Sequence, residues 1–214
     1  MHQTRPSPEP LSEVLAYLRK KFRPHAIILY GSRSRGAGTA SSDWDLFLLR
    51  RGGRERHVRD FEGQALDVFV ESDTILKLPV TLDLLRLRGG KVLLDQRGEA
   101  RKLLRRVDAL AKRGPPKPMK GEVAALRVWA WKMVDRAKTG GAYGNYRRAA
   151  LLTELLSLTY ELKGRFFPGP KRALAEMTPW MLDKWTRALA PGASMREIEN
   201  LVAAVVGPPF STAS

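Results

Sequence analysis

The chain has no cysteine and only three histidines among its 214 residues. The lack of cysteine excludes a disulfide framework, a thiolate metal site and a cysteine nucleophile. The three histidines, at positions 2, 25 and 57, are too scattered for a histidine-rich zinc site. No apolar run approaches the ~18 residues that a membrane-spanning helix needs. The polar, proline-rich stretch at residues 1–10 is unlike a signal peptide, so we expect a cytoplasmic protein with no membrane partner.

Basic residues outnumber acidic ones, with 38 Lys and Arg against 22 Asp and Glu and a net charge of +16. A field of that sign attracts phosphates and nucleic acids. A generally arginine-rich composition explains the excess equally well. The densest basic segment surrounds His57 and is a candidate contact for nucleic acid, with a solvated hairpin tip as the alternative. Its arginines are Arg50, Arg51, Arg54, Arg56 and Arg59.

The clearest domain boundary is residues 113–121, where three prolines fall within nine residues. Such a segment cannot lie inside a helix or a central strand. Residues 1–112 mix short apolar runs with helical patterns, whereas residues 122–214 show helical periodicity throughout. The sequence therefore predicts an α+β protein: a small mixed-sheet α/β domain, a linker at 113–121, and an all-helical bundle domain.

Short apolar runs predict the strands of the first domain, at residues 25–30, 43–49, 65–70 and, as an edge strand, 92–95. Amphipathic patterns predict flanking helices at residues 11–22 and 97–112. The basic segment 50–60 contains Gly52-Gly53 and is expected to be an exposed turn. In the second domain, helical faces recur at residues 123–137, 151–162, 177–190 and 194–206, with a break at 166–170.

Three aspartates in the first domain form a candidate metal site. Asp43 and Asp45 are two apart on one predicted strand, so their side chains point the same way. Neighbouring carboxylates repel each other unless a cation joins them, and Mg²⁺ prefers oxygen ligands. Asp67 lies inside another apolar strand, where a carboxylate is costly without a partner or a metal. If the two strands pair, these aspartates can hold two metal ions that serve phosphoryl or nucleotidyl transfer.

A Gly-Ser corner precedes these aspartates. Gly31 and Ser32 follow the first predicted strand, and glycine lets a phosphate approach the backbone, whose amides and the serine hydroxyl bind its oxygens. Arg33 and Arg35 flank the corner and can pair with the same charge. It is not a P-loop, because no Gly-Lys-Ser/Thr follows. We therefore expect this corner to bind the phosphates of a nucleotide.

The run Gly31, Ser32, ten residues, Asp43, x, Asp45 resembles the signature of the DNA polymerase β-type nucleotidyltransferase superfamily. The local sequence GSRSRG…SDWDLFLL is similar to that of its minimal bacterial branch, and Asp67 is at the position of the third carboxylate of that family. The resemblance implies two Mg²⁺ ions and a nucleoside triphosphate donor, with ATP expected. It also implies that Asp43 and Asp45 are metal ligands and that Asp67 is a ligand or base.

The helical half resembles, more loosely, the C-terminal domain of kanamycin nucleotidyltransferase-like proteins and related HEPN-type bundles. There the helical domain closes over the nucleotide and helps shape the acceptor site. By this resemblance Glu154 or Glu161 is a candidate base for an acceptor hydroxyl, and Arg147 or Arg148 a candidate triphosphate contact; a solvated polar face is the alternative. No histidine lies beyond His57, so the HEPN nuclease motif is missing.

These features predict a Mg²⁺-dependent nucleotidyltransferase that moves a nucleoside monophosphate, with AMP expected, onto an acceptor hydroxyl. An aminoglycoside-like small molecule is one acceptor, although a strongly basic protein is a poor host for a polycation. A protein hydroxyl, as in antitoxin-type nucleotidyltransferases, and an RNA 3′ end are the others. A non-catalytic module that binds nucleotide or nucleic acid is the alternative outside enzymes.

Overall fold

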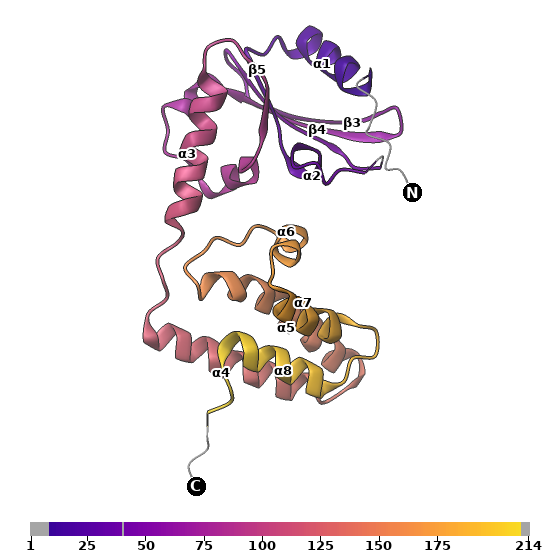
Figure 1. Ribbon diagram of the computed structural model, residues 1–214, viewed down its shortest axis with the longest axis vertical. Coiled ribbons are helices and arrows are strands. Elements are labelled where there is room, and N and C mark those ends of the chain that lie inside the picture. Colours follow the sequence, from indigo (N-terminus) through magenta and orange to yellow (C-terminus); the bar gives the residue numbers. More distant parts are fainter. Residues whose placement is uncertain (1–8, 40, 211–214) are drawn as a thin grey trace. The chain divides into compact units, whose positions relative to one another are not determined.

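The computed structural model describes residues 9–39 and 41–210, and the side chains from residue 11 onward within these ranges. The chain divides into two compact units, Met1–Arg113 and Gly114–Ser214 (Figure 1). Most of the proline-rich stretch at residues 1–10 lies outside the described residues. No described helix has both the length and the apolar character needed to cross a bilayer.

The first unit is built on a mixed five-stranded sheet in the order β3-β4-β2-β1-β5. Its strands are β1 (Ala26–Leu29), β2 (Trp44–Arg50), β3 (Glu55–Phe61), β4 (Gln64–Ser72) and β5 (Lys91–Asp95). Strands β2 and β4 run parallel, and the other neighbouring pairs are antiparallel. The predicted small mixed sheet is therefore confirmed, with four of its strands at the apolar runs identified in the sequence.

Helices cover both faces of the sheet (Figure 1). Because side chains alternate along a strand, Ile27, Leu46 and Leu48 face helix α1 (Glu9–Phe22) and pack with its Val14 and Leu18. On the other face, Ile28, Phe47 and Leu49 pack against helix α3 (Glu99–Arg113) and the 3₁₀ turn η2 (Leu82–Leu87). The odd-numbered residues of β2, which include Asp45, therefore share the face that α3 covers.

The structure of residues 50–60 differs from the prediction. Residues 50–60 were expected to form an exposed turn, but only the segment around Gly52-Gly53 turns, and Glu55–Phe61 pairs antiparallel with β4. Most of this outer strand is exposed, so it shows no alternation of apolar and polar residues. Its seven residues carry two arginines, a glutamate and an aspartate, as is common on sheet edges. The strand is held by backbone hydrogen bonds, which the side-chain pattern does not reveal.

Asp95 connects the last strand to helix α3. Its side chain is 1% exposed, and its two carboxylate oxygens accept hydrogen bonds of 3.1 Å from the backbone amides of Ala100 and Arg101. Amides at the first turn of a helix have no partner within the helix. A residue at the end of β5 therefore fixes where α3 begins.

The described part of the second unit is helical, as the sequence predicts. Its helices are α4 (Lys120–Ala137), α5 (Gly141–Glu161), α6 (Pro170–Ala175), α7 (Pro179–Leu189) and α8 (Met195–Val206). Trp185, Leu155 and Leu201 are fully buried in their common core. Helix α4 begins within the segment expected to be a linker, and α6 is a short helix that begins at the end of the predicted break.

Candidate active site

Asp45 and Asp67 lie side by side on adjacent parallel strands. Asp45 of β2 is directly paired in register with Asp67 of β4, and both side chains are partly buried on the face that α3 covers. Neighbouring strands are about 4.8 Å apart, so this register brings two carboxylates from distant parts of the chain together. Asp43 precedes β2 by one residue and is exposed.

Gly31 lies directly against Asp45. Its φ of +73° is a backbone conformation that favours glycine, and a Cβ atom placed there would lie 2.0 Å from Oδ2 of Asp45. The Tyr30 amide donates a 2.9 Å hydrogen bond to the carbonyl of Asp45. The chain therefore turns at Gly31, into the short helix α2 (Gly31–Ser34), in contact with the carboxylate. The glycine is required by both the turn and the close approach.

The arginines that flank this corner differ in their surroundings. The Arg33 guanidinium stacks 4.1 Å from the ring centroid of Trp44 and donates to the carbonyl of Ser42 at 2.6 Å and to Oε1 of Gln64 at 2.7 Å. Burial lowers its pKa, and the nearby Asp43 opposes that shift. Arg33 thereby holds the segment before Asp43, while Arg35 is exposed. Phosphate contacts by Ser32, Arg33 and Arg35 stay predictions.

Arg56 of β3 binds the Asp67 carboxylate in bidentate fashion. Its Nε and Nη2 atoms donate to Oδ1 and Oδ2 of Asp67 at 3.1 and 2.9 Å, and this contact raises the Arg56 pKa. Among the described residues, the three aspartates Asp43, Asp45 and Asp67 do not form a group with ligand atoms all within 4.8 Å of one another. The Arg56 side chain is 61% exposed, so it can leave Asp67 at small cost.

Two residues absent from the sequence prediction complete this end of the sheet. Tyr30 is buried, and burial raises the pKa of its phenol; Arg86 opposes that shift, and the carboxylates of Asp45 and Asp67 add to it. Arg86 of η2 stacks 3.7 Å from the ring centroid of Phe69. The site therefore joins two carboxylates with a neutral phenol and two guanidinium groups. Arg86 belongs to no motif, so only the fold reveals it.

Comparison with known proteins identifies this unit. The profile of the Nucleotidyltransferase domain family matches residues 11–111, which include the sheet, the Gly31 corner and the aspartates. The first unit is a nucleotidyltransferase domain. This assignment confirms the resemblance to the polymerase β-like superfamily and supports nucleotidyl transfer as the general activity of this domain.

The other comparisons add little to this assignment. A nucleotidyltransferase-like protein from Exiguobacterium sibiricum 255-15 aligns over 93% of this chain and 76% of its own. The two are 11% identical, with a TM-score of 0.36. A comparison with curated proteins found no match.

A second titratable cluster lies at the opposite end of β1 from Gly31. His25 is buried between two carboxylates: its Nε2 atom contacts Asp73, and its Nδ1 atom lies 3.1 Å from Oε2 of Glu99. Asp73 also forms an ion pair with Arg97, whose Nη1 atom lies 3.4 Å from Oδ2 of Asp73. Among the described residues this group has the ligand spacing of a metal site. Within the nucleotidyltransferase domain it ties β1 to α3 and to η1 (Asp73–Leu76), away from the predicted Mg²⁺ ligands.

The candidates in the helical unit lie on α5. Glu154 and Glu161 are both exposed, and Arg147 stacks 4.7 Å from the ring centroid of Tyr143. Arg148 donates hydrogen bonds of 3.5 Å to the carbonyls of Ala188 and Ala190. Among the described residues of this unit, no contact identifies either glutamate as a base or either arginine as a triphosphate ligand. Those roles, which come from resemblance alone, stay predictions.

The basic segment around His57 is engaged within the nucleotidyltransferase domain. Arg50 pairs with Glu55 at 3.0 Å, Arg54 with Glu71 at 2.9 Å and Arg56 with Asp67 at 2.9 Å. These ion pairs neutralise part of the charge that nucleic acid would meet. The proposed nucleic-acid contact stays a prediction.

Proposed function

We propose that this protein transfers a nucleoside monophosphate, with AMP from ATP as the expected group, to a hydroxyl of an acceptor. The observation that carries the proposal is the register pair of Asp45 and Asp67, placed against the Gly31 corner. This arrangement puts two oxygen-donor side chains beside a turn that a phosphate can approach closely. The family assignment of residues 11–111 supports the general activity.

The donor set suits magnesium. Asp43, Asp45 and Asp67 offer only carboxylate oxygens, the ligand type that Mg²⁺ prefers, and the Asp45 carboxylate lies directly against the Gly31 turn. We propose these aspartates as the ligands of two Mg²⁺ ions. When bound, such ions neutralise the triphosphate and polarise the acceptor oxygen. Asp67 can serve once Arg56 turns from its carboxylate to a phosphate group.

The residues of the chain have separate roles in this proposal. Gly31 and Ser32 hold the triphosphate through backbone amides and a hydroxyl. Arg56 and Arg86 supply positive charge near the phosphates, and Arg33 holds the segment that carries Asp43. In the reaction, a bond forms between the acceptor oxygen and the α-phosphorus while the bond from that phosphorus to pyrophosphate breaks. The hydroxyl proton passes to a carboxylate, for which Asp67 is a candidate, or to water.

We propose only the chemical class of the acceptor. It presents a hydroxyl and is either a small molecule, with aminoglycosides as the first class to test, or a macromolecule. The net charge of +16 opposes a polycation and favours an acidic protein or an RNA end. The expected cytoplasmic location stays a prediction.

Labelled transfer tests the proposal. Purified protein is incubated with Mg²⁺ and each α-³²P-labelled nucleoside triphosphate, with aminoglycosides, tRNA or lysate as acceptors. We expect label on one acceptor class together with pyrophosphate release. Asp45→Asn should abolish both, whereas Asp135→Asn, at an exposed position of α4, should change neither. Saturable Mg-nucleotide binding without pyrophosphate release from any acceptor would instead establish the non-catalytic binding module.

A further inference from the structure

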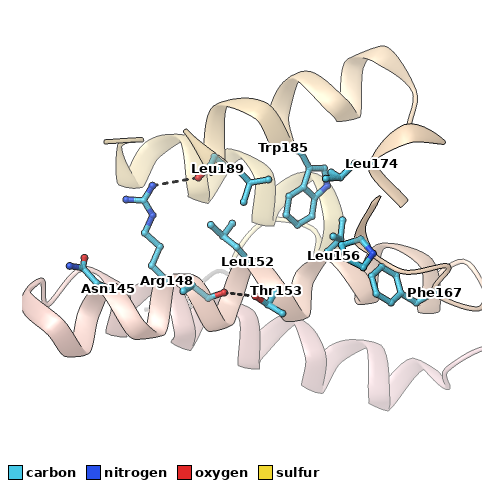
Figure 2. A pocket seen from close by; sticks show the side chains of 12 residues that line it. Asn145, Arg148, Leu152, Thr153, Leu156, Phe167, Leu174, Trp185 and Leu189 are labelled. Atoms are coloured by element: carbon cyan, nitrogen blue, oxygen red, sulfur yellow. Dashed lines mark hydrogen bonds between the residues drawn. The ribbon is translucent and has the colours of Figure 1, made fainter. Parts of the chain in front are cut away.

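The helical unit contains a cavity of its own. It lies between α5, α6 and α7 and has a volume of about 690 Å³ (Figure 2). Cavities of ~300–1,000 Å³ are typical of small-molecule sites. All of its lining residues belong to the second unit, and none is among the residues proposed for nucleotidyl transfer except Arg148, one of two arginines weighed as triphosphate contacts.

Most of the cavity wall is apolar. Leucine and aromatic side chains from three helices and the segment before α6 line it, among them Leu152, Leu156, Phe167, Leu174 and Leu189. Leu189 is 49% exposed, so the cavity opens to solvent along α7. An apolar wall of this kind favours a hydrocarbon or aromatic body over a sugar or a nucleotide, since burying hydroxyls without partners is costly.

Trp185 is an unsatisfied donor in that wall. Its side chain lines the cavity and is only 1% exposed, yet its indole Nε1 atom has no hydrogen-bond partner. Indole N–H groups usually find an acceptor when they are buried. An acceptor atom on a bound molecule would satisfy this donor.

Arg148 brings positive charge to one end of the cavity. Figure 2 shows its guanidinium near Leu189, at the end of the cavity opposite Phe167. Its hydrogen bonds to the carbonyls of Ala188 and Ala190 are long, at 3.5 Å each, and in the described part of the chain no carboxylate pairs with it within 4.0 Å. A carboxylate head group would pair with Arg148 much more strongly than these carbonyls do.

We propose that this cavity binds a small anionic amphiphile, with its carboxylate at Arg148, its apolar body along Leu152 and Leu156, and an acceptor atom on that body at Trp185. The charge, the apolar wall and the unsatisfied indole select the three parts of the ligand independently. The proposal does not depend on the acceptor or the nucleotide of the transfer reaction.

Calorimetric titration of the 214-residue chain tests the proposal without nucleotide. Decanoate should bind saturably, and 1-decanol, which lacks the charge, about tenfold more weakly. In a series of oxodecanoates that differ in the position of the keto group, at least one should bind more tightly than decanoate. That advantage should vanish in Trp185→Phe, which removes the indole donor and keeps an aromatic ring.

Variants at two arginines separate charge from stability. Arg148→Met should weaken decanoate binding about tenfold and leave 1-decanol binding unchanged. Arg187→Met is the matched control, because Arg187 also lies on this unit but pairs with Asp183 and does not line the cavity. Circular dichroism checks that each variant is folded. Absence of saturable decanoate binding, equal losses in both arginine variants, or displacement of decanoate by Mg-ATP would overturn the proposal.

Discussion

Gly31 and Asp45 are so close that no side chain fits between them: a Cβ atom on residue 31 would lie 2.0 Å from the Asp45 carboxylate. The Gly-Ser corner and the acidic strand are therefore in direct contact, although thirteen residues lie between Gly31 and Asp45 in the sequence. The glycine fixes the position of the carboxylate as well as the path of the chain.

Gly31→Ala should reduce transfer activity about a hundredfold, because displacing a catalytic group by ~1 Å has effects of that size. Gly36→Ala is the control, since Gly36 has the same φ of +73° and open space around it. Both variants carry the left-handed backbone strain, and Gly31→Ala adds the clash with Asp45, so thermal unfolding checks that each variant is folded at the assay temperature. Equal activity in the two variants would show that the contact with Asp45 has no functional role.

Arg56→Met should tighten Mn²⁺ binding in the absence of nucleotide about fivefold, which corresponds to the ~1 kcal/mol that an exposed ion pair contributes at most. The reason is that Arg56 occupies the Asp67 carboxylate. Titration followed by electron paramagnetic resonance measures the affinity. Arg54→Met, which removes the partner of Glu71 on the same side of the hairpin, should leave it unchanged. Unchanged affinity in Arg56→Met would argue against Asp67 as a ligand.

His57 should make the stability depend on pH. Burial lowers its pKa in the folded protein, and the positive charge of Lys21 adds to this shift. Since the unfolded chain then binds the proton more readily, the stabilisation is complete above the unfolded pKa of about 6.5 and is lost as the pH falls below it. Between pH 7.5 and 5.5, thermal unfolding of His57→Gln should therefore change less than that of the unmodified protein. Parallel curves would contradict this assignment.

Asp95→Ala should lower the free energy of unfolding by about 1–2 kcal/mol, the range for removing a helix cap. The loss arises because the amides of Ala100 and Arg101 lose their acceptor. Urea denaturation measures it. Asp108→Ala, at an exposed position within the same helix, should change stability much less. A similar loss in both variants would assign the effect to charge rather than to capping.

Much of the nucleotidyltransferase domain follows from the sequence. Apolar runs such as Ala26–Leu29 predict its buried strands, and the predicted second strand contains Asp45, whereas Asp43 lies one residue before β2. The sequence does not show which strands are neighbours, so it predicts the pairing of Asp45 with Asp67 only on the condition that β4 pairs with β2. The structure shows that these two strands do pair.

Other parts of the site have no signal in the sequence. Arg86 comes to the site through the packing of a 3₁₀ turn on Phe69, and the ion pair of Arg56 with Asp67 depends on β3, whose exposed residues give no periodic pattern. The role of Arg33 is also not evident from the sequence. Its place beside Gly31 indicates a phosphate contact, whereas its hydrogen bonds hold the loop before Asp43. Proximity in the sequence does not distinguish these roles.

The charged outer strand β3 has a consequence for the behaviour of the protein at high concentration. The outer edge of a strand at the border of a sheet offers its free backbone groups to any other chain that can align with it. The charged side chains of this strand, such as Arg56 and Arg59, would lose hydrating water if a second copy aligned with it, and this cost opposes the pairing. The same side chains that obscure the strand in the sequence thus protect the sheet from growing by the addition of further molecules.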